Sequence, residues 1–328
     1  MLLILYLVRR HPSLNRYSEP MKIAADVDTG IDDALALVYL SHWARAEGAE
    51  LVVTTSAGNC TATQAAANTL DVLRASGEVN PQVVVGAAEP GGVALTTTPE
   101  THGPDGLGYH RTQAATPERG SAEAAVAAWQ GAEKLLVAGP AMNLAHGYVG
   151  EVTLMCGAFH YPGNTTDTAE WNAWVDPHGL RDALRAMEAE GVRHTMCPLN
   201  VTERVVLQPA RLQGWCAALR KQGRGQLAAL LEDALRFYFE FHESVGVGYC
   251  AQIHDLAAAM VMLGTVEYEV EACRVDVEVE GERRGTVTCR SDGAGMVGPT
   301  RVLTGLDPEA VFAEFEGVVL GFRDGVNF

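Results

Sequence analysis

Four aspartates crowd an eight-residue stretch near the start of the chain. Asp26, Asp28, Asp32 and Asp33 occur in the pattern D-x-D-T-G-I-D-D, in which Asp26 continues an apolar run and Asp32 opens a helical pattern. One or two such acids could be a helix N-cap or solvated surface groups. Four are harder to explain, because like charges buried together are costly unless a cation compensates them. Oxygen ligands suit a hard divalent cation, so the stretch predicts a metal site.

Two other motifs share part of this pattern. An EF-hand loop needs its glycine at the sixth position after a third acid, but here Gly30 comes fifth and Thr29 intervenes. The aspartyl-phosphatase signature also begins with two acids spaced by one, as Asp26 and Asp28 are, but it wants Thr or Val at the position of Gly30. A magnesium-dependent aspartyl phosphatase therefore stays open as the alternative function.

Further polar candidates are scattered along the chain. They are His102 in T-H-G-P-D-G-L-G, Asn164, Glu170, Trp171 and Asn172 in G-N-T-T-D-T-A-E-W-N, and His254 and Asp255 in I-H-D-L-A. Taken singly, an acid at a helix start is usually a cap, a lone histidine is usually a structural hydrogen bonder, and a polar loop is usually just surface. A tryptophan inside such a loop is unusual.

Elements that could bring these residues together recur along the chain. Short apolar runs at 23–27, 51–56, 135–138 and 152–156 each lead through small residues into a helical pattern, and 83–85 and 195–197 are further strand candidates. Such alternation predicts an α/β fold with a mostly parallel central sheet flanked by helices. Ligands bind beyond the carboxyl ends of such strands, where the polar loops fall. After Leu207 the chain is more helical to about Gly264, followed by a hairpin (268–279 and 285–290) and a last helix (308–321).

The rest of the chain shows no repeat, linker or composition shift, which predicts a single domain over residues 21–328. Residues 1–20 precede the first good strand and are interpreted as an N-terminal extension. Their apolar run of eight residues cannot span a bilayer, and its two arginines follow the run, whereas a signal peptide is charged before it.

The composition of the chain limits the classes of binding partner and the state of its cysteines. The formal net charge is −17 with no basic block, which disfavours nucleic acid and anionic membrane as partners but leaves a neutral small molecule open. The seven cysteines are odd in number, scattered and without a C-x-x-C pair. This pattern predicts buried, reduced thiols in a cytoplasmic protein.

An ordered set of motifs spans nearly the whole chain. D-x-D-x-G-x-D-D (26–33) is followed by T-T-x-A-G-N (54–59), H-G-x-D-G-L-G (102–108), G-P-x-x-N (139–143), G-A-F-x-x-P-G-N…A-E-x-N-x-x-x-D-P (157–177) and H-D (254–255). In this order they resemble the inosine–uridine-preferring nucleoside hydrolase family. The resemblance implies a Rossmann-like fold and an enzyme that cuts the N-glycosidic bond of ribonucleosides.

The resemblance also implies roles for the candidates. A calcium ion would be held by Asp28, Asp33, Asp255 and the backbone carbonyl of Met142, with Asp28 as general base and His254 as the acid that assists departure of the base. Substrate contacts would come from Asp32 and Asn172 at the 2′- and 3′-hydroxyls, Asn164 and Glu170 at the 5′-hydroxyl, His102 and Trp171 at the nucleobase, and Asn59 through its support of Asp28.

Departures from the family pattern bear on the substrate. Met142 stands where Thr is usual in the family, and Thr29 stands where Pro is usual. Neither replacement removes a ligand of the implied calcium ion. With Trp171, the segment A-E-W-N resembles the purine-preferring branch of the family, in which a tryptophan stacks on the nucleobase. His254, in contrast, is typical of the branch in which an acid assists departure of the nucleobase. The preference among nucleobases therefore stays open, and the resemblance implies a homodimer or homotetramer.

Overall fold

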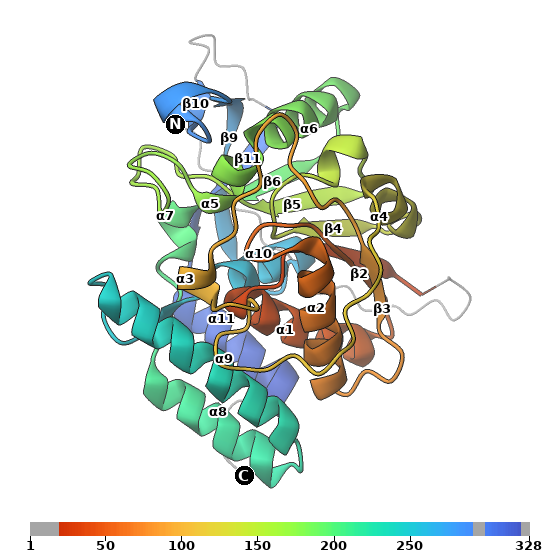
Figure 1. The fold of residues 1–328 in the computed structure, drawn as a ribbon, viewed down its shortest axis with the longest axis vertical. Helices are drawn as coiled ribbons and strands as arrows, with labels where there is room; N and C mark the ends of the chain where they lie inside the picture. The colour runs from red at the N-terminus through yellow and green to blue at the C-terminus, as the bar shows by residue number, and fades with distance from the viewer. Residues whose placement is uncertain (1–19, 291–298, 323–328) are drawn as a thin grey trace.

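A nine-stranded sheet runs through the centre of the molecule (Figure 1). The structure is a computed structural model, and it describes residues 20–290 and 299–322. The strands of this sheet are β1 (Lys22–Val27), β2 (Glu50–Thr55), β3 (Gln82–Val85), β4 (Lys134–Val137), β5 (Glu151–Met155), β6 (His194–Cys197), β9 (Tyr268–Val277), β10 (Val287–Arg290) and β11 (Thr300–Leu306), in the order β10-β9-β11-β6-β5-β4-β1-β2-β3. A separate pair joins β7 (Val206–Leu207) and β8 (Ala251–Gln252).

Helices connect the strands and cover the sheet. They are α1 (Ile31–Glu47), α2 (Ala62–Ala75), α3 (Pro99–His102), α4 (Ala122–Ala128), α5 (Trp171–Val175), α6 (Pro177–Glu190), α7 (Leu199–Thr202), α8 (Pro209–Lys221), α9 (Gly225–Ser244), α10 (His254–Leu263) and α11 (Pro308–Phe315). Two 3₁₀ turns, η1 (Leu144–His146) and η2 (Gly281–Arg283), and a π turn, η3 (Glu316–Leu320), complete the described elements.

The strand order reverses beside β1. The chain moves outward through β2 and β3 on one side and then through β4, β5 and β6 on the other, and all of these strands pair in parallel. Only the β9 pairings, with β11 and β10, are antiparallel within this sheet. A reversal of this kind opens a crevice beyond the carboxyl ends of the central strands, here β1 and β4.

Both faces of the sheet are buried, and β1 shows why its sequence is so apolar. Ile23, Ala25 and Val27 pack into a core with α1, α9 and α10, whereas Ala24 packs into a second core with α4 and α6. Strands covered on both sides need apolar residues at every position instead of at alternate ones. Asp26 is thus an exception that its surroundings must satisfy.

The fold class and the main elements agree with the sequence prediction. The strands before α1, α2, η1 and α5 lie where they are expected, and the late hairpin is β9 and β10. The helix expected near Asn143 is only the short turn η1, and the last helix ends as the π turn η3. The proposed extension, apart from Pro20, lies outside the described residues, so the domain boundary stays a prediction.

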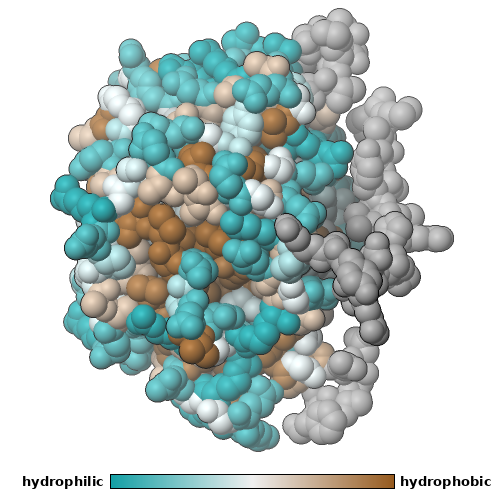
Figure 2. Space-filling model, turned by 90° about the vertical axis from the view of Figure 1, so that its right-hand side faces the viewer, coloured by the Kyte–Doolittle hydropathy of each residue, from teal (hydrophilic) through white to brown (hydrophobic). Residues whose placement is uncertain are grey.

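In residues 20–290 and 299–322, few large apolar side chains are exposed. On the face shown in Figure 2, hydrophobic residues gather near the centre and hydrophilic residues surround them. Val245, Val247 and Tyr249 are exposed together in the segment that follows α9. Among the helices of the described part, none combines the length and the apolar character that crossing a membrane requires.

The prediction of seven reduced thiols is wrong for two of the cysteines. Cys273 of β9 and Cys289 of β10 form a disulfide across the hairpin, while the other five, from Cys60 to Cys250, are free and buried. The scattered spacing concealed the bond, because Cys273 and Cys289 come together only when the two strands pair. The predicted cytoplasmic location stays a prediction.

Removing this disulfide should lower the stability of the fold. The bond closes a loop of 16 residues, and a loop of that size restricts the unfolded chain enough to contribute about 3 kcal/mol. The double variant Cys273→Ser/Cys289→Ser should therefore unfold at lower urea than the wild type. A reductant should shift the wild type in the same direction and leave the double variant unchanged. Equal midpoints for the oxidised wild type and the variant would contradict the prediction.

Candidate active site

Three buried aspartates from distant parts of the chain meet at the crevice. Carboxylate oxygens of Asp32, Asp33 and Asp255 all lie within 4.8 Å of one another. Asp32 and Asp33 occupy the first turn of α1, and Asp255 occupies the first turn of α10, which packs against α1. The N-terminal ends of helices carry a partial positive charge that favours carboxylates. The two helices together thus supply part of the compensation that this cluster needs.

Asp28 stands beside this group and is held by Asn59. The Asn59 backbone N–H donates to Asp28 Oδ2 (2.7 Å), and its side-chain amide donates to Asp28 Oδ1 (3.1 Å) and to Asp33 Oδ2 (3.3 Å). Asp33 Oδ2 also accepts from the backbone N–H of Gly30 at 2.7 Å. Asn59 thus links Asp28 and Asp33 through hydrogen bonds, and its role in substrate binding stays a prediction.

The electrostatics of the cluster fit a divalent cation. Burial, with the charge of Asp32, raises the pKa of Asp33 to about 7, and burial raises the pKa of Asp32 to about 6. Burial and neighbouring carboxylates also raise the pKa of Asp28 and of Asp255 well above the usual range. Asp33 Oδ1 is buried and has no hydrogen-bond partner among the described residues. An all-oxygen donor set with an unpaired buried oxygen suits a hard cation such as calcium or magnesium.

Asp26 belongs to a different environment. Its Oδ1 accepts from Thr54 Oγ1 (2.6 Å) and from Asn143 Nδ2 (2.9 Å), and Trp129 Nε1 donates to the same threonine hydroxyl (2.9 Å). Burial raises the pKa of Asp26 to about 6. Asp26 therefore ties β1 to β2 and to the segment after β4 through Oδ1, while its buried Oδ2 has no hydrogen-bond partner among the described residues. The phosphatase alternative needs Asp26 and Asp28 at one reacting group, and this setting of Asp26 does not favour it.

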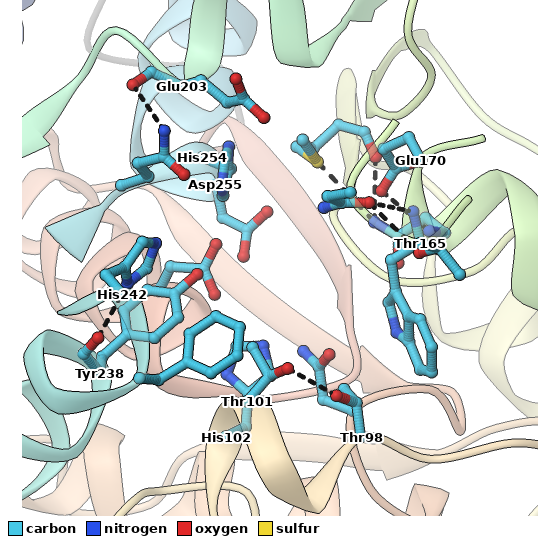
Figure 3. A pocket seen from close by; sticks show the side chains of 18 of the residues that line it. Thr98, Thr101, His102, Thr165, Glu170, Glu203, Tyr238, His242, His254 and Asp255 are labelled. Atoms are coloured by element: carbon cyan, nitrogen blue, oxygen red, sulfur yellow. Dashed lines mark hydrogen bonds between the residues drawn. The ribbon is translucent and has the colours of Figure 1, made fainter. Parts of the chain in front are cut away.

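A cavity of about 440 Å³ opens in front of the acid cluster (Figure 3). Nine of the predicted site residues line it, namely Asp32, Asn59, His102, Asn164, Glu170, Trp171, Asn172, His254 and Asp255. Asp28 and Asp33 are buried next to them. The side chain of Met142 packs in a small apolar cluster, and the metal-binding role of its carbonyl stays a prediction.

The polar residues of the loop before α5 are fixed by backbone groups. Glu170 caps α5 by accepting from the N–H groups of Asn172 (2.8 Å) and Ala173 (3.0 Å), and it also accepts from Gly157 N–H (2.9 Å). Asn172 donates its amide to Ala138 O (2.7 Å) and Met155 O (3.1 Å), which leaves its Oδ1 to accept from a ligand. Their roles in binding ribose stay predictions, but the side chains are held rigidly for them.

Asn164 is held the other way round from Asn172, with its side-chain oxygen bonded and its amide nitrogen free. Its Oδ1 accepts from the backbone N–H of Trp171 at 2.9 Å, so its amide nitrogen remains available to donate. With Asn172 as acceptor and Asn164 as donor, this wall of the cavity offers groups of both kinds. Sugar hydroxyls, which donate and accept, suit such a wall.

Both predicted site histidines are neutral and carry their protons on different nitrogens. Burial lowers the pKa of His102 and of His254 to about 3. The Ile31 N–H donates to His102 Nδ1 (3.0 Å), which leaves the ring proton on Nε2. His254 Nδ1 lies 3.0 Å from the Thr202 hydroxyl, which itself donates to Pro198 O. This pattern places the His254 proton on Nδ1 and leaves Nε2 as an acceptor.

Sequence reasoning missed one wall of the cavity. Tyr238, Phe241 and His242 of α9 line it, as do Glu203, Gln252, Val245 and Val247. His242 Nδ1 bonds the Tyr238 carbonyl at 2.8 Å, and its ring packs edge-on against the Tyr238 ring. From sequence alone, a helix rich in aromatic residues is predicted to pack in the hydrophobic core. The only signal was His242, which directly follows a stretch rich in aromatic residues, 237–241.

A parallel sheet with an acidic, histidine-bearing cavity beyond its strand ends is the arrangement of an enzyme that acts on a small molecule. The family model "Inosine-uridine preferring nucleoside hydrolase" matches residues 23–313, and the chain belongs to that family.

Individual relatives agree with this assignment. The chain is 29% identical over 307 residues to the pyrimidine-specific ribonucleoside hydrolase RihA of Shewanella sp. (strain ANA-3), covering 87% of this chain and 92% of the relative. It is 29% identical to a probable uridine nucleosidase 2 of Oryza sativa subsp. japonica, covering 80% of each. The solved purine-preferring ribonucleoside hydrolase from Gardnerella vaginalis superposes with a TM-score of 0.79 at 25% identity, covering 92% of this chain and 98% of that one.

The acid cluster should make the cation-free protein less stable as pH rises. Asp32 and Asp33 have folded pKa values of about 6 and about 7 against an ordinary aspartate pKa of 3.8, so the folded chain holds protons that the unfolded chain has released. The stability contribution of the cluster therefore falls between about pH 4 and pH 7. In chelator, the melting temperature should drop across this range, and added calcium should raise it most above pH 7.

The matched variants for this measurement are Asp33→Asn and Asp182→Asn. Asp33→Asn should remove most of the calcium-induced rise, whereas Asp182→Asn, which changes an exposed acid on α6, should keep it. A rise of equal size in both variants would place the cation elsewhere.

Proposed function

We propose that this chain hydrolyses the N-glycosidic bond of ribonucleosides with the help of a bound calcium ion, releasing nucleobase and ribose. The observation that carries the proposal is the meeting of Asp32, Asp33 and Asp255 beside a cavity lined by the loop from Asn164 to Asn172. Membership in a nucleoside hydrolase family supports the same conclusion. The calcium ion and the roles of single residues are part of the proposal.

The proposed cation ligands are Asp28, Asp33, Asp255 and the carbonyl of Met142. Asp32 is a further candidate, because its carboxylate lies in the group of three and not only at the cavity wall. A bound calcium ion would supply a positive charge that acidifies water and attracts ribose hydroxyls. Its large and flexible oxygen shell suits several carboxylates better than the strict octahedron of magnesium does.

Asp28 is the proposed general base. Both of its oxygens accept from Asn59, which fixes the carboxylate plane while leaving lone pairs free to take a proton from the attacking water. As the bond to the nucleobase breaks, the ribose gains positive charge, as in glycoside hydrolysis generally. The fixed carboxylates of the cluster would stabilise that charge without having to reorganise.

His254 is the proposed group that assists departure of the nucleobase. In the free chain its neutral ring carries the proton on Nδ1 and accepts at Nε2. Acting as an acid therefore requires a second proton on the ring, which burial disfavours. His102 already has its proton on Nε2 and is the proposed donor to the nucleobase.

The substrate range is proposed as ribonucleosides of both base classes. The relatives divide, because RihA is named pyrimidine-specific and the Gardnerella vaginalis enzyme purine-preferring. The cavity offers a flat aromatic surface at Trp171 and, at His102, a donor, features that either base class could use. A homodimer or homotetramer is proposed from the family resemblance.

A nucleoside panel tests the proposal directly. Inosine, adenosine, guanosine, uridine and cytidine are incubated with the protein, and free base and ribose are measured with calcium and with chelator. Hydrolysis should require the cation. Asp28→Asn should lower kcat by roughly 10²–10⁴-fold, the usual contribution of a general base, or by more if a ligand is lost as well. Failure of every nucleoside would overturn the proposal.

Asp26→Asn is the matched control, because Asp26 is an equally buried acid two positions away that does not line the cavity. The folded variant should keep its rate within about tenfold of wild type, since it loses no proposed ligand or base. The phosphatase alternative predicts the reverse, with phosphate released from phosphomonoesters and lost in this variant.

The stereochemistry of the product gives an independent test. Direct attack by water on a β-nucleoside inverts the anomeric carbon, because the route has no covalent sugar intermediate. NMR of a fast reaction should therefore show α-ribose first, before the anomers equilibrate. If β-ribose formed first, a carboxylate of the site would have to act as nucleophile and Asp28 could not be only a base.

A further inference from the structure

The β9–β10 hairpin reaches the cavity wall from the edge of the sheet. Beyond the strand pair, Thr286 forms an isolated antiparallel bridge with Ala169, directly before Glu170. The hydroxyls of Thr286 and Thr168 are 2.7 Å apart. The hairpin therefore touches the same loop that supplies Asn164 and Glu170, and in Figure 1 it lies beside α5.

Arg284, at the tip of the hairpin, contacts Trp174 in two ways. Its Nε donates to the Trp174 carbonyl at 2.9 Å, and its guanidinium carbon lies 3.8 Å from the centre of the Trp174 ring. Gly285 allows this approach, because a Cβ there would come within 2.5 Å of Trp174 Cα. The contact thus combines a hydrogen bond with a cation–π interaction, a geometry that a planar guanidinium can supply.

Trp174 in turn supports Trp171. The two rings stack with centres 5.8 Å apart and planes 24° from parallel. Trp171 lines the cavity, and its indole N–H is buried without a hydrogen-bond partner among the described residues. Its backbone is fixed by Asn164, but its ring orientation depends on packing. The hairpin, Trp174 and Trp171 therefore form a continuous chain of contacts from the sheet edge to the cavity.

We propose that Arg284 is a positioning residue that acts through Trp174 to hold the Trp171 ring in the cavity wall. This inference rests on the proposed function, since it assigns Trp171 to substrate binding. Arg284 touches neither the acid cluster nor Asp28 in the contacts described. A preordered aromatic wall lowers the cost of binding without changing the chemical step. Its loss should therefore appear in KM and spare kcat.

The first experiment compares Arg284→Ala, Arg284→Lys and Arg283→Ala by steady-state kinetics on the best nucleoside of the panel. Arg283 is the exposed neighbour and serves as the matched control. Arg284→Ala should raise KM by about 3- to 30-fold, the range of a cation–π contact, with kcat within about threefold. Arg284→Lys keeps the charge but not the planar donor and should recover part of the loss. Equal KM values for Arg284→Ala and Arg283→Ala would overturn the proposal, as would a fall confined to kcat.

A double-mutant cycle tests the route through Trp174. In a Trp174→Leu background, Arg284→Ala should add little further change in KM, because the partner through which it acts is gone. The same fold-change in both backgrounds would overturn the route. If Arg284→Ala does not fold, the cycle is run with Arg284→Lys, for which the same outcomes decide.

A measurement without substrate separates this inference from the proposed function. Near-ultraviolet circular dichroism reports the fixed asymmetric surroundings of tryptophans, so Arg284→Ala should change the spectrum of the folded protein and Arg283→Ala should not. An unchanged spectrum for Arg284→Ala would overturn the positioning role even if nucleosides are cleaved. An inert wild type with the expected spectral change would instead overturn the proposed function and leave the contact chain as found.

Discussion

The burial of several carboxylates at one point is the constraint on which the rest of this structure depends. Asp28, Asp32, Asp33 and Asp255 are almost inaccessible to water, and burying such charges together is expensive. The chain offsets part of that cost with two helix N-termini and with the donors of Asn59 and Gly30. The backbone at Gly58 also lies so close to Asp28 that it leaves no room for a side chain, because a Cβ there would lie 2.0 Å from Asp28 Oδ2. A bound cation would compensate the negative charge of the carboxylates that these groups leave uncompensated.

The topology explains how residues so far apart in the sequence serve one site. The strand order reverses at β1, so the loops after β1, β2, β4 and β5 open on the same crevice. Asn172 reinforces the junction, because its amide bonds carbonyls beyond β4 and at the end of β5 while its oxygen stays free. The same side chain thus ties the segments after two strands together and presents an acceptor to the cavity. Different atoms of this one residue thus hold the scaffold and face the cavity.

The sequence predicted the parts of this fold that are written in local patterns. Apolar runs buried on both faces, each followed by a helix, were enough to predict the parallel sheet, and the ordered motifs led to the acids of the cavity. Long-range pairing was beyond such patterns. Cys273 and Cys289 bond because two strands place them side by side, and the wall from α9 was hidden because Tyr238 and Phe241 resemble ordinary core residues. Asp26 was grouped with the cation-binding acids, although alternation along β1 turns its side chain toward Thr54 and the α4 side.

The two predicted histidines show that the cavity separates donor and acceptor roles through its scaffold. A backbone N–H from the start of α1 fixes the proton of His102 on Nε2, whereas a threonine of α7 fixes the proton of His254 on Nδ1. Burial keeps both rings neutral near pH 7. Since each tautomer is set by a group outside the cavity, the rings are not interchangeable even though both line the cavity. His102 can donate a hydrogen bond into the cavity as it stands, whereas His254 could donate from Nε2 only after gaining a second proton, which burial disfavours.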